Sequence, residues 1–303
     1  MAGTMHPDEV PTDAALVARL VAEQFTAWAG LPVEPAPSAG TDNALYRLGD
    51  DMVVRLPRIG WAAGQPEKEC RWLPGLAPRL PLPIPAPLAC GEPAGGYPWR
   101  WSIAPWLPGE NATLDRVADL DSFAADLDSF VTTLHGIDAS GGPTPGAHNS
   151  GRGVPLALRD ADTRAAIAEF GDRIDGNAAT AAWDATLSAP VWDDPPVWVH
   201  GDIQSGNLLV VDGRLSAVID FGCLGAGDPA VDLIVAWNLL PAGPRETFHA
   251  AMAVDDATWS RGRGWALSTA LIALPYCWDS NPTLAGIARD TIGEVFRDAE
   301  SGA

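Results

Sequence analysis

Three oxygen-bearing side chains in one short stretch have the types and spacing needed to handle a magnesium-bound nucleotide. Asp202 and Asn207 lie five residues apart, and Asp220 follows Asn207 thirteen residues later, directly before Phe221-Gly222. Transfer of a phosphoryl group from a nucleotide needs a carboxylate that orients and deprotonates the attacking hydroxyl, together with oxygen ligands that hold Mg²⁺ on the phosphates. The stretch therefore predicts phosphoryl transfer, with Asp202 as the catalytic base and with Asn207 and Asp220 as metal ligands.

The segment between these side chains predicts a tight hairpin. Apolar runs at residues 208–211 and 215–219 flank Asp212-Gly213, which is a strong turn signal. A hairpin returns Asp220 towards Asn207, so that both can face one Mg²⁺ ion. The alternative is a surface hairpin whose polar ends only cap the turn.

The two motifs resemble the catalytic signatures of kinases. Asp202 and Asn207 keep the spacing of the protein-kinase loop H-R-D-L-x-x-x-N, and residues 220–222 read D-F-G. With Gly201 in place of the kinase Arg, and with GAGDPAVD at residues 225–232, the chain resembles the aminoglycoside phosphotransferase family. Three upstream segments resemble that family's nucleotide-covering hairpin, first helix and hinge: residues 40–58, 67–73 and 106–110.

The resemblance implies an α+β, bilobal protein-kinase-like fold. It places a strand-rich, nucleotide-covering N-lobe at residues 1–104 and a mostly helical C-lobe, with the catalytic loop and the acceptor site, at residues 105–303. Residue patterns agree with this division. Strands are predicted at residues 46–48, 52–56 and 101–104, and helices at 13–29, 67–76 and 117–137. Residues 80–87, where every second residue is Pro, predict an extended connector, and the Gly-rich residues 141–153 predict a flexible loop.

The predicted nucleotide site of the N-lobe rests on a charged pair. Protein kinases pair a strand Lys with a helix Glu to hold the α- and β-phosphates. Here the strand position is Arg55, and its predicted helix partner is Glu69, with Glu67 as the alternative. Arg can serve as a planar, permanently charged fork, although its reach differs from that of Lys. The backbone and hydroxyl of Thr41 are predicted to approach the phosphates.

The resemblance also assigns hinge and supporting residues. It places nucleotide-base contacts at the backbone of Pro105, whose carbonyl can accept, and of Leu107, whose N–H can donate. His200 is expected to pack behind the catalytic loop rather than to transfer protons. Asp232 is expected to brace the same loop, because Asp228-Pro229 is a good helix start that places it in the first turns.

The sequence gives the least information about the residues that bind the acceptor. Tyr276, Trp278 and Asp279 are candidates to line it, with core packing as the alternative. The expected reaction moves the γ-phosphoryl group of a Mg²⁺-nucleotide, ATP by default or else GTP, to a small-molecule hydroxyl. The first candidate acceptor is an aminoglycoside-type antibiotic. The alternatives are another small alcohol (a macrolide, choline-like amine, amino acid or sugar) and a catalytically silent nucleotide-binding protein, against which the complete set of catalytic residues argues.

Charge and composition restrict the classes of molecule that the protein is expected to bind. The chain has 19 basic and 39 acidic residues and a net charge of −20, which argues against nucleic acid and anionic membranes as partners. Residues 114–197 contain fourteen Asp or Glu against five Arg. This acidity either only solubilises the protein or attracts a cationic acceptor. The sequence does not indicate an oligomeric state.

The N-terminus and the cysteines favour a cytoplasmic enzyme. The first residues lack the basic start and apolar core of a signal peptide, and no apolar run reaches the roughly 18 residues of a membrane span. The four cysteines are Cys70, Cys90, Cys223 and Cys277. Because they are widely spaced without a CxxC pair, we expect buried thiols rather than a disulfide framework or a metal site.

Overall fold

The chain forms two compact units. We describe them from a computed structural model, in which residues 9–36, 42–170, 173–279 and 281–301 are described. The first unit comprises Met1–Pro108 and Ala217–Gly222, and the second comprises Gly109–Ser216 and Cys223–Ala303. In the described ranges no helix is both long and apolar enough to span a membrane.

The first unit is built on a five-stranded antiparallel sheet in the order β1-β2-β3-β5-β4. The hairpin of β2 and β3 turns at Gly49, whose φ of 60° is a conformation that glycine adopts without strain. The predicted strands at residues 46–48, 52–56 and 101–104 are confirmed, each as part of a longer strand. The strands are β1 (Val33–Pro35), β2 (Asn43–Leu48), β3 (Met52–Pro57), β4 (Ala89–Gly91) and β5 (Trp101–Pro105).

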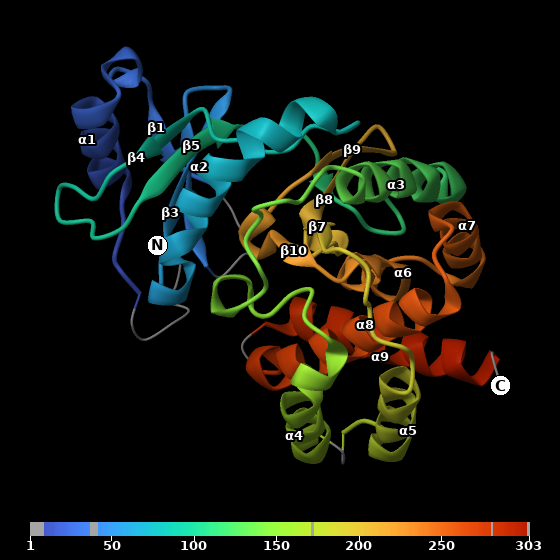
Figure 1. Cartoon of the computed structure of the whole chain (residues 1–303). Helices are drawn as coiled ribbons and strands as arrows, with labels where there is room; N and C mark the ends of the chain where they lie inside the picture. Colours follow the sequence, from blue (N-terminus) through green and yellow to red (C-terminus); the bar gives the residue numbers. More distant parts are fainter. Residues whose placement is uncertain (1–8, 37–41, 171–172, 280, 302–303) are drawn as a thin grey trace. The chain divides into compact units, whose positions relative to one another are not determined.

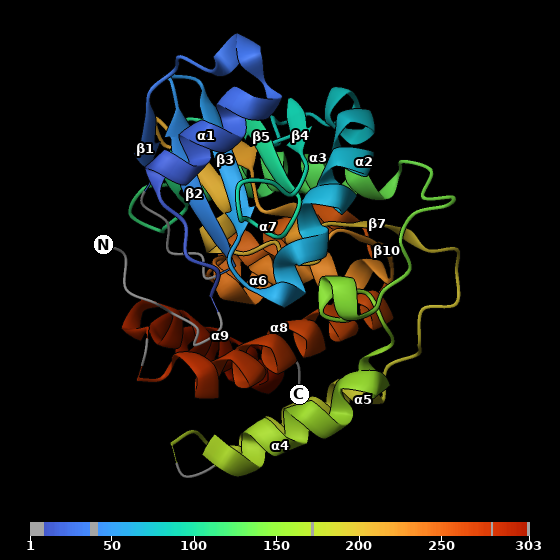
Figure 2. The ribbon, with the colours of Figure 1, turned by 90° about the vertical axis from the view of Figure 1, so that its left-hand side faces the viewer.

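Helix α1 (Ala14–Gln24) covers one face of this sheet (Figures 1 and 2). It begins after Asp13, whose Oδ1 accepts a hydrogen bond of 2.7 Å from the backbone N of Leu16. Val17, Leu20 and Val21 are fully buried against alternate residues of β2, β3 and β5. Side chains alternate along a strand, so the strand residues between those that contact α1 project to the opposite face of the sheet. The helix that begins at Gln65 packs on that face.

Helix α2 (Gln65–Leu76) packs against β3, β4 and β5 and confirms the helix predicted at residues 67–76. It also corrects the prediction for two cysteines, because Cys70 on α2 and Cys90 on β4 form a disulfide. The 20-residue separation of the two cysteines gave no sign of this contact, which arises from the packing of α2 on β4. Cys277 is buried as predicted, and Cys223 is half-buried. The cysteines therefore no longer argue for a reducing compartment.

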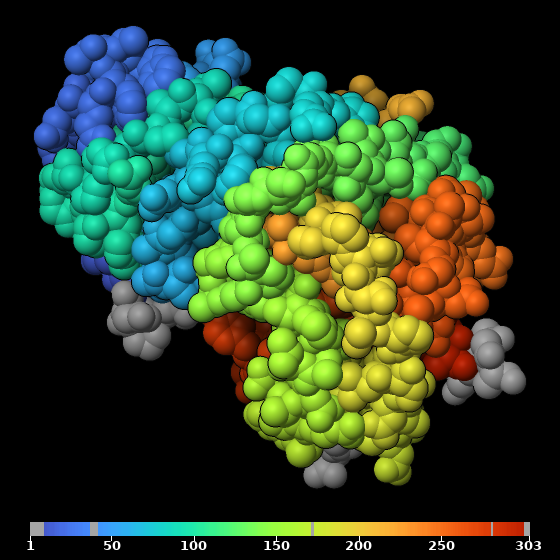
Figure 3. Space-filling model, viewed as in Figure 1, coloured from blue at the N-terminus to red at the C-terminus, as the bar shows by residue number. Residues whose placement is uncertain are grey.

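The second unit is mostly helical. The long helix α8 packs against α4, α5 and α9, and α4 and α5 lie side by side as a projection from it (Figures 1 and 3). Its helices are α3 (Leu120–His135), α4 (Asp160–Phe170), α5 (Gly176–Leu187), α6 (Val235–Asn238), α7 (Ala242–Met252), α8 (Asp256–Cys277) and α9 (Pro282–Ser301).

Short strands of the second unit frame the predicted catalytic loop. The loop runs from the end of β7 (Val197–Val199) to the start of β8 (Leu208–Val211). β7 pairs with β10 (Gly225–Gly227) and β8 with β6 (Glu110–Asn111). The predicted turn at Asp212-Gly213 is confirmed: both residues have positive φ, and β9 (Arg214–Val218) follows.

Candidate active site

The predicted catalytic loop is fixed from behind by one buried carboxylate. Asp232 is fully buried, and its two oxygens accept hydrogen bonds from the backbone N of His200 at 3.0 Å and of Gly201 at 2.7 Å. His135 on α3 places Nε2 3.0 Å from the same side chain. Asp232 follows Asp228, which caps a short 3₁₀ helix (Pro229–Leu233) rather than the expected α-helix. These contacts give Asp232 the geometry of a brace, and they pair it with His135.

Gly201 explains why this chain lacks the Arg of the protein-kinase loop. Its φ is 82°, a value that non-glycine residues rarely adopt. A Cβ atom at this position would lie 2.6 Å from the carbonyl O of Cys223 and 2.9 Å from Cβ of Arg152. Any larger residue would displace backbone here, so glycine is required by the local packing.

Three side-chain donors hold the carboxylate of Asp202. Oδ2 accepts from the amides of Gln204 and Asn207, each at 2.9 Å, and Oδ1 lies 3.3 Å from Nη2 of Arg152. The backbone N of Asp202 donates to Nδ1 of His200 at 3.1 Å. A carboxylate offers about four acceptor positions, so roughly one remains on Asp202 for a substrate hydroxyl.

The side chain of Asn207 holds Asp202 through its amide nitrogen and has the chemistry to bind a metal ion through its amide oxygen. Its amide nitrogen donates to both the backbone O and the Oδ2 of Asp202, which leaves the amide oxygen for another partner. Asp220, which belongs to the first unit, likewise uses Oδ1 for a 3.3 Å contact from the backbone N of Gly222. Each of the two side chains thus keeps one oxygen, the kind of ligand that Mg²⁺ prefers. Since they lie in different units, their joint role as metal ligands stays a prediction.

The first unit brings together the predicted phosphate-binding residues. Nη1 of Arg55 lies 2.6 Å from Oε2 of Glu69, and its Nη2 lies 3.6 Å from Oδ1 of Asp220. Burial would lower the pKa of Arg55, but the carboxylates of Glu69 and Asp220 outweigh burial and raise it. Burial raises the pKa of Glu69, and the charge of Arg55 offsets only part of that effect. Among the two helix residues considered, Glu69 is therefore the one that pairs with Arg55.

The Asp-Phe-Gly segment carries two features that its sequence did not reveal. Asp220 has a φ of 63°, and such strained conformations cluster at functional sites. Nζ of Lys68, on α2, donates to the carbonyl O of Gly222 at 2.7 Å. Lys68 is the only lysine of the chain, and it supports this segment rather than the strand position of the kinase Lys.

The predicted hinge residues lie at the end of β5. Pro105 is paired with Met52, and the backbone N of Trp106 donates to the carbonyl O of Asp51 at 2.7 Å. The N–H of Leu107 has no hydrogen-bond acceptor among the described residues, which leaves it available to a ligand, and its role in the hinge stays a prediction. Thr41 lies outside the described residues.

The three acceptor-site candidates lie at the far end of α8. Tyr276 is exposed, Asp279 follows the helix, and Trp278 packs on Phe170 with a centroid separation of 5.4 Å. With a rise of about 1.5 Å per residue, Tyr276 is roughly 10 Å further along α8 than Thr269, which contacts Arg152. Their role as acceptor contacts stays a prediction.

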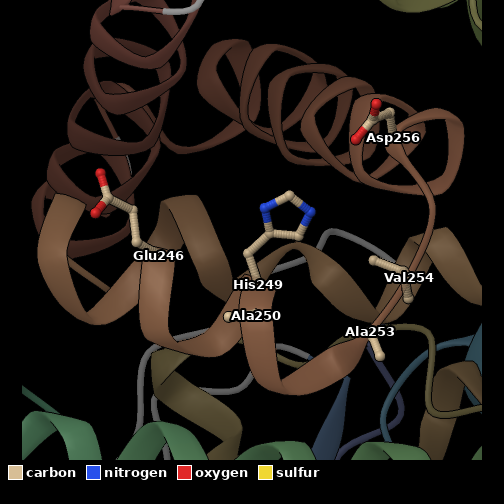
Figure 4. A pocket seen from close by; sticks show the side chains of 6 residues that line it. All are labelled: Glu246, His249, Ala250, Ala253, Val254 and Asp256. Atoms are coloured by element: carbon tan, nitrogen blue, oxygen red, sulfur yellow. The ribbon is translucent and has the colours of Figure 1, made fainter.

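A pocket elsewhere in the second unit contains none of the predicted site residues. It has a volume of about 390 Å³ and is drawn in Figure 4. His249 projects into it and stacks on Trp259 at 3.9 Å between ring centroids, and burial lowers its pKa. We assign it no part in the site, because all the residues that line it come from α7, the start of α8 and the loop between them.

Comparison with known proteins shows a family match over most of the chain. The sequence model of the phosphotransferase enzyme family matches residues 34–265. An aminoglycoside 3'-phosphotransferase from Escherichia coli is 35% identical over 74 residues, which span 24% of this chain and only 27% of that protein.

Two solved structures share the fold. Aminoglycoside 2'-phosphotransferase-IIIa in its GDP complex has a TM-score of 0.73 at 16% identity, covering 95% of this chain and all of the other. The macrolide 2'-phosphotransferase MphH from Brachybacterium faecium has a TM-score of 0.60 at 24% identity, covering 93% and 98%. These likenesses confirm the predicted α+β, kinase-like fold. With a family match over most of its length, the chain belongs to the phosphotransferase enzyme family.

Proposed function

We propose that this protein transfers the γ-phosphoryl group of a Mg²⁺-nucleotide to a hydroxyl of a small molecule. The observation that carries the proposal is the carboxylate of Asp202, which three donors hold in place while one acceptor position remains. Such a group can orient a hydroxyl and accept its proton. Positioning and electrostatics supply most of the rate in phosphoryl transfer, so no covalent intermediate on the protein is required.

Each predicted residue has a part in this proposal. Asp202 is the catalytic base, while His200 and Asp232 fix its loop from behind. Arg55, held by Glu69, neutralises charge on the non-transferred phosphates. Further nucleotide contacts are assigned to Thr41 and to the hinge backbone at Pro105 and Leu107, and acceptor contacts to Tyr276, Trp278 and Asp279.

Asn207 and Asp220 are the residues that would hold the magnesium ion. When bound, Mg²⁺ supplies positive charge that offsets the phosphates. We keep ATP as the default donor and GTP as the alternative, because one structural relative is described as a GDP complex. A nucleoside triphosphate donor is available in the cytoplasm, where we propose that the protein acts.

Two acceptor classes compete within this proposal. The names of the relatives and the acidic composition favour an aminoglycoside-type antibiotic. The contact of Arg152 with Asp202 favours the second class, a small alcohol that is not a polyamine, because a guanidinium beside the reacting hydroxyl repels an ammonium group.

The test is a panel of alcohols assayed for acceptor-dependent release of nucleoside diphosphate, with ATP and GTP as donors. The panel holds an aminoglycoside, a macrolide, a choline-like amine, a hydroxy amino acid and a sugar. We expect one member to raise release well above the acceptor-free rate and to yield a phosphate ester detected by mass spectrometry. If nucleotide binds but none is phosphorylated, the catalytically silent alternative is favoured.

Salt separates the two acceptor classes in the same assay. The screening length falls from about 30 Å at about 10 mM salt to about 8 Å at about 150 mM. A polyamine drawn in by the acidic second unit should therefore show a KM that rises clearly with salt. A neutral acceptor should show almost no change.

A further inference from the structure

Asp202 is paired with an arginine, although the chain as a whole is strongly acidic. Arg152 spans the site: one terminal nitrogen lies 3.3 Å from Oδ1 of Asp202, and the other donates to Oγ1 of Thr269 on α8 at 2.6 Å. The side chain of Arg152 is only 12% exposed. It is held in place by Asn149, a fully buried side chain that donates to the backbone O of Arg152 at 2.9 Å.

A second guanidinium lies over the same tryptophan ring as that of Arg152. The side chain of Arg159 stacks over the fully buried ring of Trp265 at 4.8 Å, and that of Arg152 lies 6.0 Å from the same ring. Nε of Arg159 donates to Oγ of Ser268 at 2.9 Å. Its two terminal nitrogens have no hydrogen-bond partner, and Arg159 has no ion-pair partner, among the described residues.

These two charges are not balanced locally. Burial and the neighbouring charge of Arg152 lower the pKa of Arg159 to about 10, so it remains charged at neutral pH. Asp202 can compensate one guanidinium, and Asp162 acts on Arg159 only at longer range. Burying part of a charge without a partner costs free energy. Binding of an anion next to the charge offsets this cost.

We propose that Arg152 and Arg159 form an anion-binding subsite next to Asp202, which takes a carboxylate or other oxyanion of the acceptor while Asp202 takes its hydroxyl. Trp265 sets the spacing of the two guanidinium groups, and Thr269 and Ser268 fix their orientation. This inference rests on the proposed phosphotransferase function and assigns its acceptor to the anionic or zwitterionic small alcohols, such as a hydroxy amino acid or a sugar acid. It reverses the cationic acceptor expected from net charge.

The same subsite could bind a second source of oxyanion, the phosphoryl group that is transferred. The acceptor is favoured, because Arg152, Arg159 and Asp202 all belong to the second unit and need no particular placement of the first unit to meet. The experiment must nevertheless separate the two sources.

The test compares acceptors that differ by one carboxylate. Serine is paired with ethanolamine and glucuronate with glucose, and an aminoglycoside serves as the polycation. A charge-assisted hydrogen bond of about 1.5–3 kcal/mol predicts that kcat/KM for the carboxylated member exceeds that of its partner by about 10- to 100-fold. In Arg159→Gln this preference should fall to about twofold or less, and Arg159→Lys should restore part of it.

Arg164→Gln is the matched control, because Arg164 lies one turn into α4 and is paired with Asp160 and Asp184 on the surface. It should keep the preference of the wild type. Thermal unfolding with glucuronate or glucose at fixed ionic strength provides a readout that needs no turnover. Glucuronate alone should raise Tm in the wild type and in Arg164→Gln, and not in Arg159→Gln.

Several outcomes would overturn the subsite. One is a wild type that prefers the neutral members or the polycation, or whose Tm does not distinguish glucuronate from glucose. A second is an Arg159→Gln variant that loses activity equally with all acceptors, which would indicate that Arg159 only supports packing. A third is a variant in which only the KM of the nucleotide rises, which would indicate that Arg159 binds the transferred phosphate. Failure of the phosphotransferase proposal itself looks different: the wild type would then phosphorylate no acceptor of either pair, whereas the Tm comparison would still show whether glucuronate binds at the two arginines.

Discussion

Two buried carboxylates, Glu69 in the first unit and Asp232 in the second, are stabilised in different ways. In the first unit Arg55 and Glu69 form a buried ion pair, and Oε1 of Glu69 is buried without a hydrogen-bond partner among the described residues. In the second unit the carboxylate of Asp232 is satisfied by backbone N–H groups and by His135. The second arrangement relies on backbone donors fixed by the fold, whereas the first depends on charges that balance incompletely.

This difference suggests a division of labour. A carboxylate held by backbone donors keeps its geometry without a ligand, so the loop around Asp202 is preorganised for chemistry. A buried ion pair with an unsatisfied oxygen is only marginally favourable and gains when an added charge, such as a nucleotide phosphate with its metal, completes it. We therefore expect substitutions in the second unit to affect turnover and folding, and those in the first to affect nucleotide binding.

The largest expected effect is that of Asp202→Asn on turnover. The change is nearly isosteric and removes the base, so kcat should fall by about 10³-fold or more, within the range of about 10²–10⁴ typical of general bases. Nucleotide affinity, measured by calorimetry, should stay within about twofold of the wild type. Asp212→Asn, in the exposed hairpin turn, is the control with the same chemical change. Near wild-type turnover in Asp202→Asn on the true acceptor would refute the catalytic assignment.

Asp220→Ala tests the first unit. It removes a predicted metal ligand together with one partner of Arg55, so the gain in nucleotide affinity on adding Mg²⁺ should be largely lost. Calorimetric titrations with and without Mg²⁺ measure this gain directly. Affinity in the absence of metal should change little, which separates loss of the ion from general damage. An unchanged affinity for Mg²⁺-nucleotide would exclude Asp220 as a ligand.

Asp232→Asn should destabilise the fold more than it changes binding. The amide cannot accept at both ends, so a buried backbone N–H of His200 or Gly201 is left without an acceptor, at a cost of about 3 kcal/mol. Denaturant unfolding measures this loss as a lower midpoint. Asp126→Asn is the control, because its surface pair with Arg214 contributes about 1 kcal/mol or less. Equal stabilities of the two variants would remove the distinction drawn between the units.

The smallest expected effect belongs to a helix cap in the second unit. Asp255 caps α8 by accepting from the backbone N of Thr258 at 2.7 Å, and Asp255→Ala should lose about 1 kcal/mol of unfolding free energy. Hydrogen bonds from the side chain and the backbone of Thr258 lower the pKa of Asp255. The contribution is therefore present above the ordinary pKa near 3.8 and is lost as pH falls through the lower, folded value. Unfolding curves of variant and wild type should converge at that acidity, and a gap that persists would argue against the cap.

Local patterns sufficed for part of the secondary structure. The hairpin of β2 and β3, the helix containing Glu69, and the turn at Asp212-Gly213 follow from short-range periodicity and turn chemistry. Arg152 lies in a Gly-rich loop for which composition predicted only flexibility. Its place beside Asp202 depends on the buried Asn149 and on α8, more than a hundred residues further along the chain.

Contacts between segments that are distant in sequence also explain the other features that the sequence did not predict. The Cys70–Cys90 disulfide and the contact of His135 with Asp232 join segments that are distant in sequence. No periodicity within a single element encodes such a pairing. The absence of an Arg at Gly201 could be read from the sequence, but its cause required the positions of Cys223 and Arg152.

The single lysine gives the protein an unusual chemical handle. Apart from the N-terminus, an amine-reactive reagent can modify only Lys68, and lysine-specific cleavage can cut only there. Because its ammonium group donates to the carbonyl O of Gly222, acylation should be slow while that contact persists and faster when the Asp-Phe-Gly segment shifts. The rate at which Lys68 is acylated, followed by mass spectrometry, would then report on the conformation of this segment without the introduction of an engineered label site.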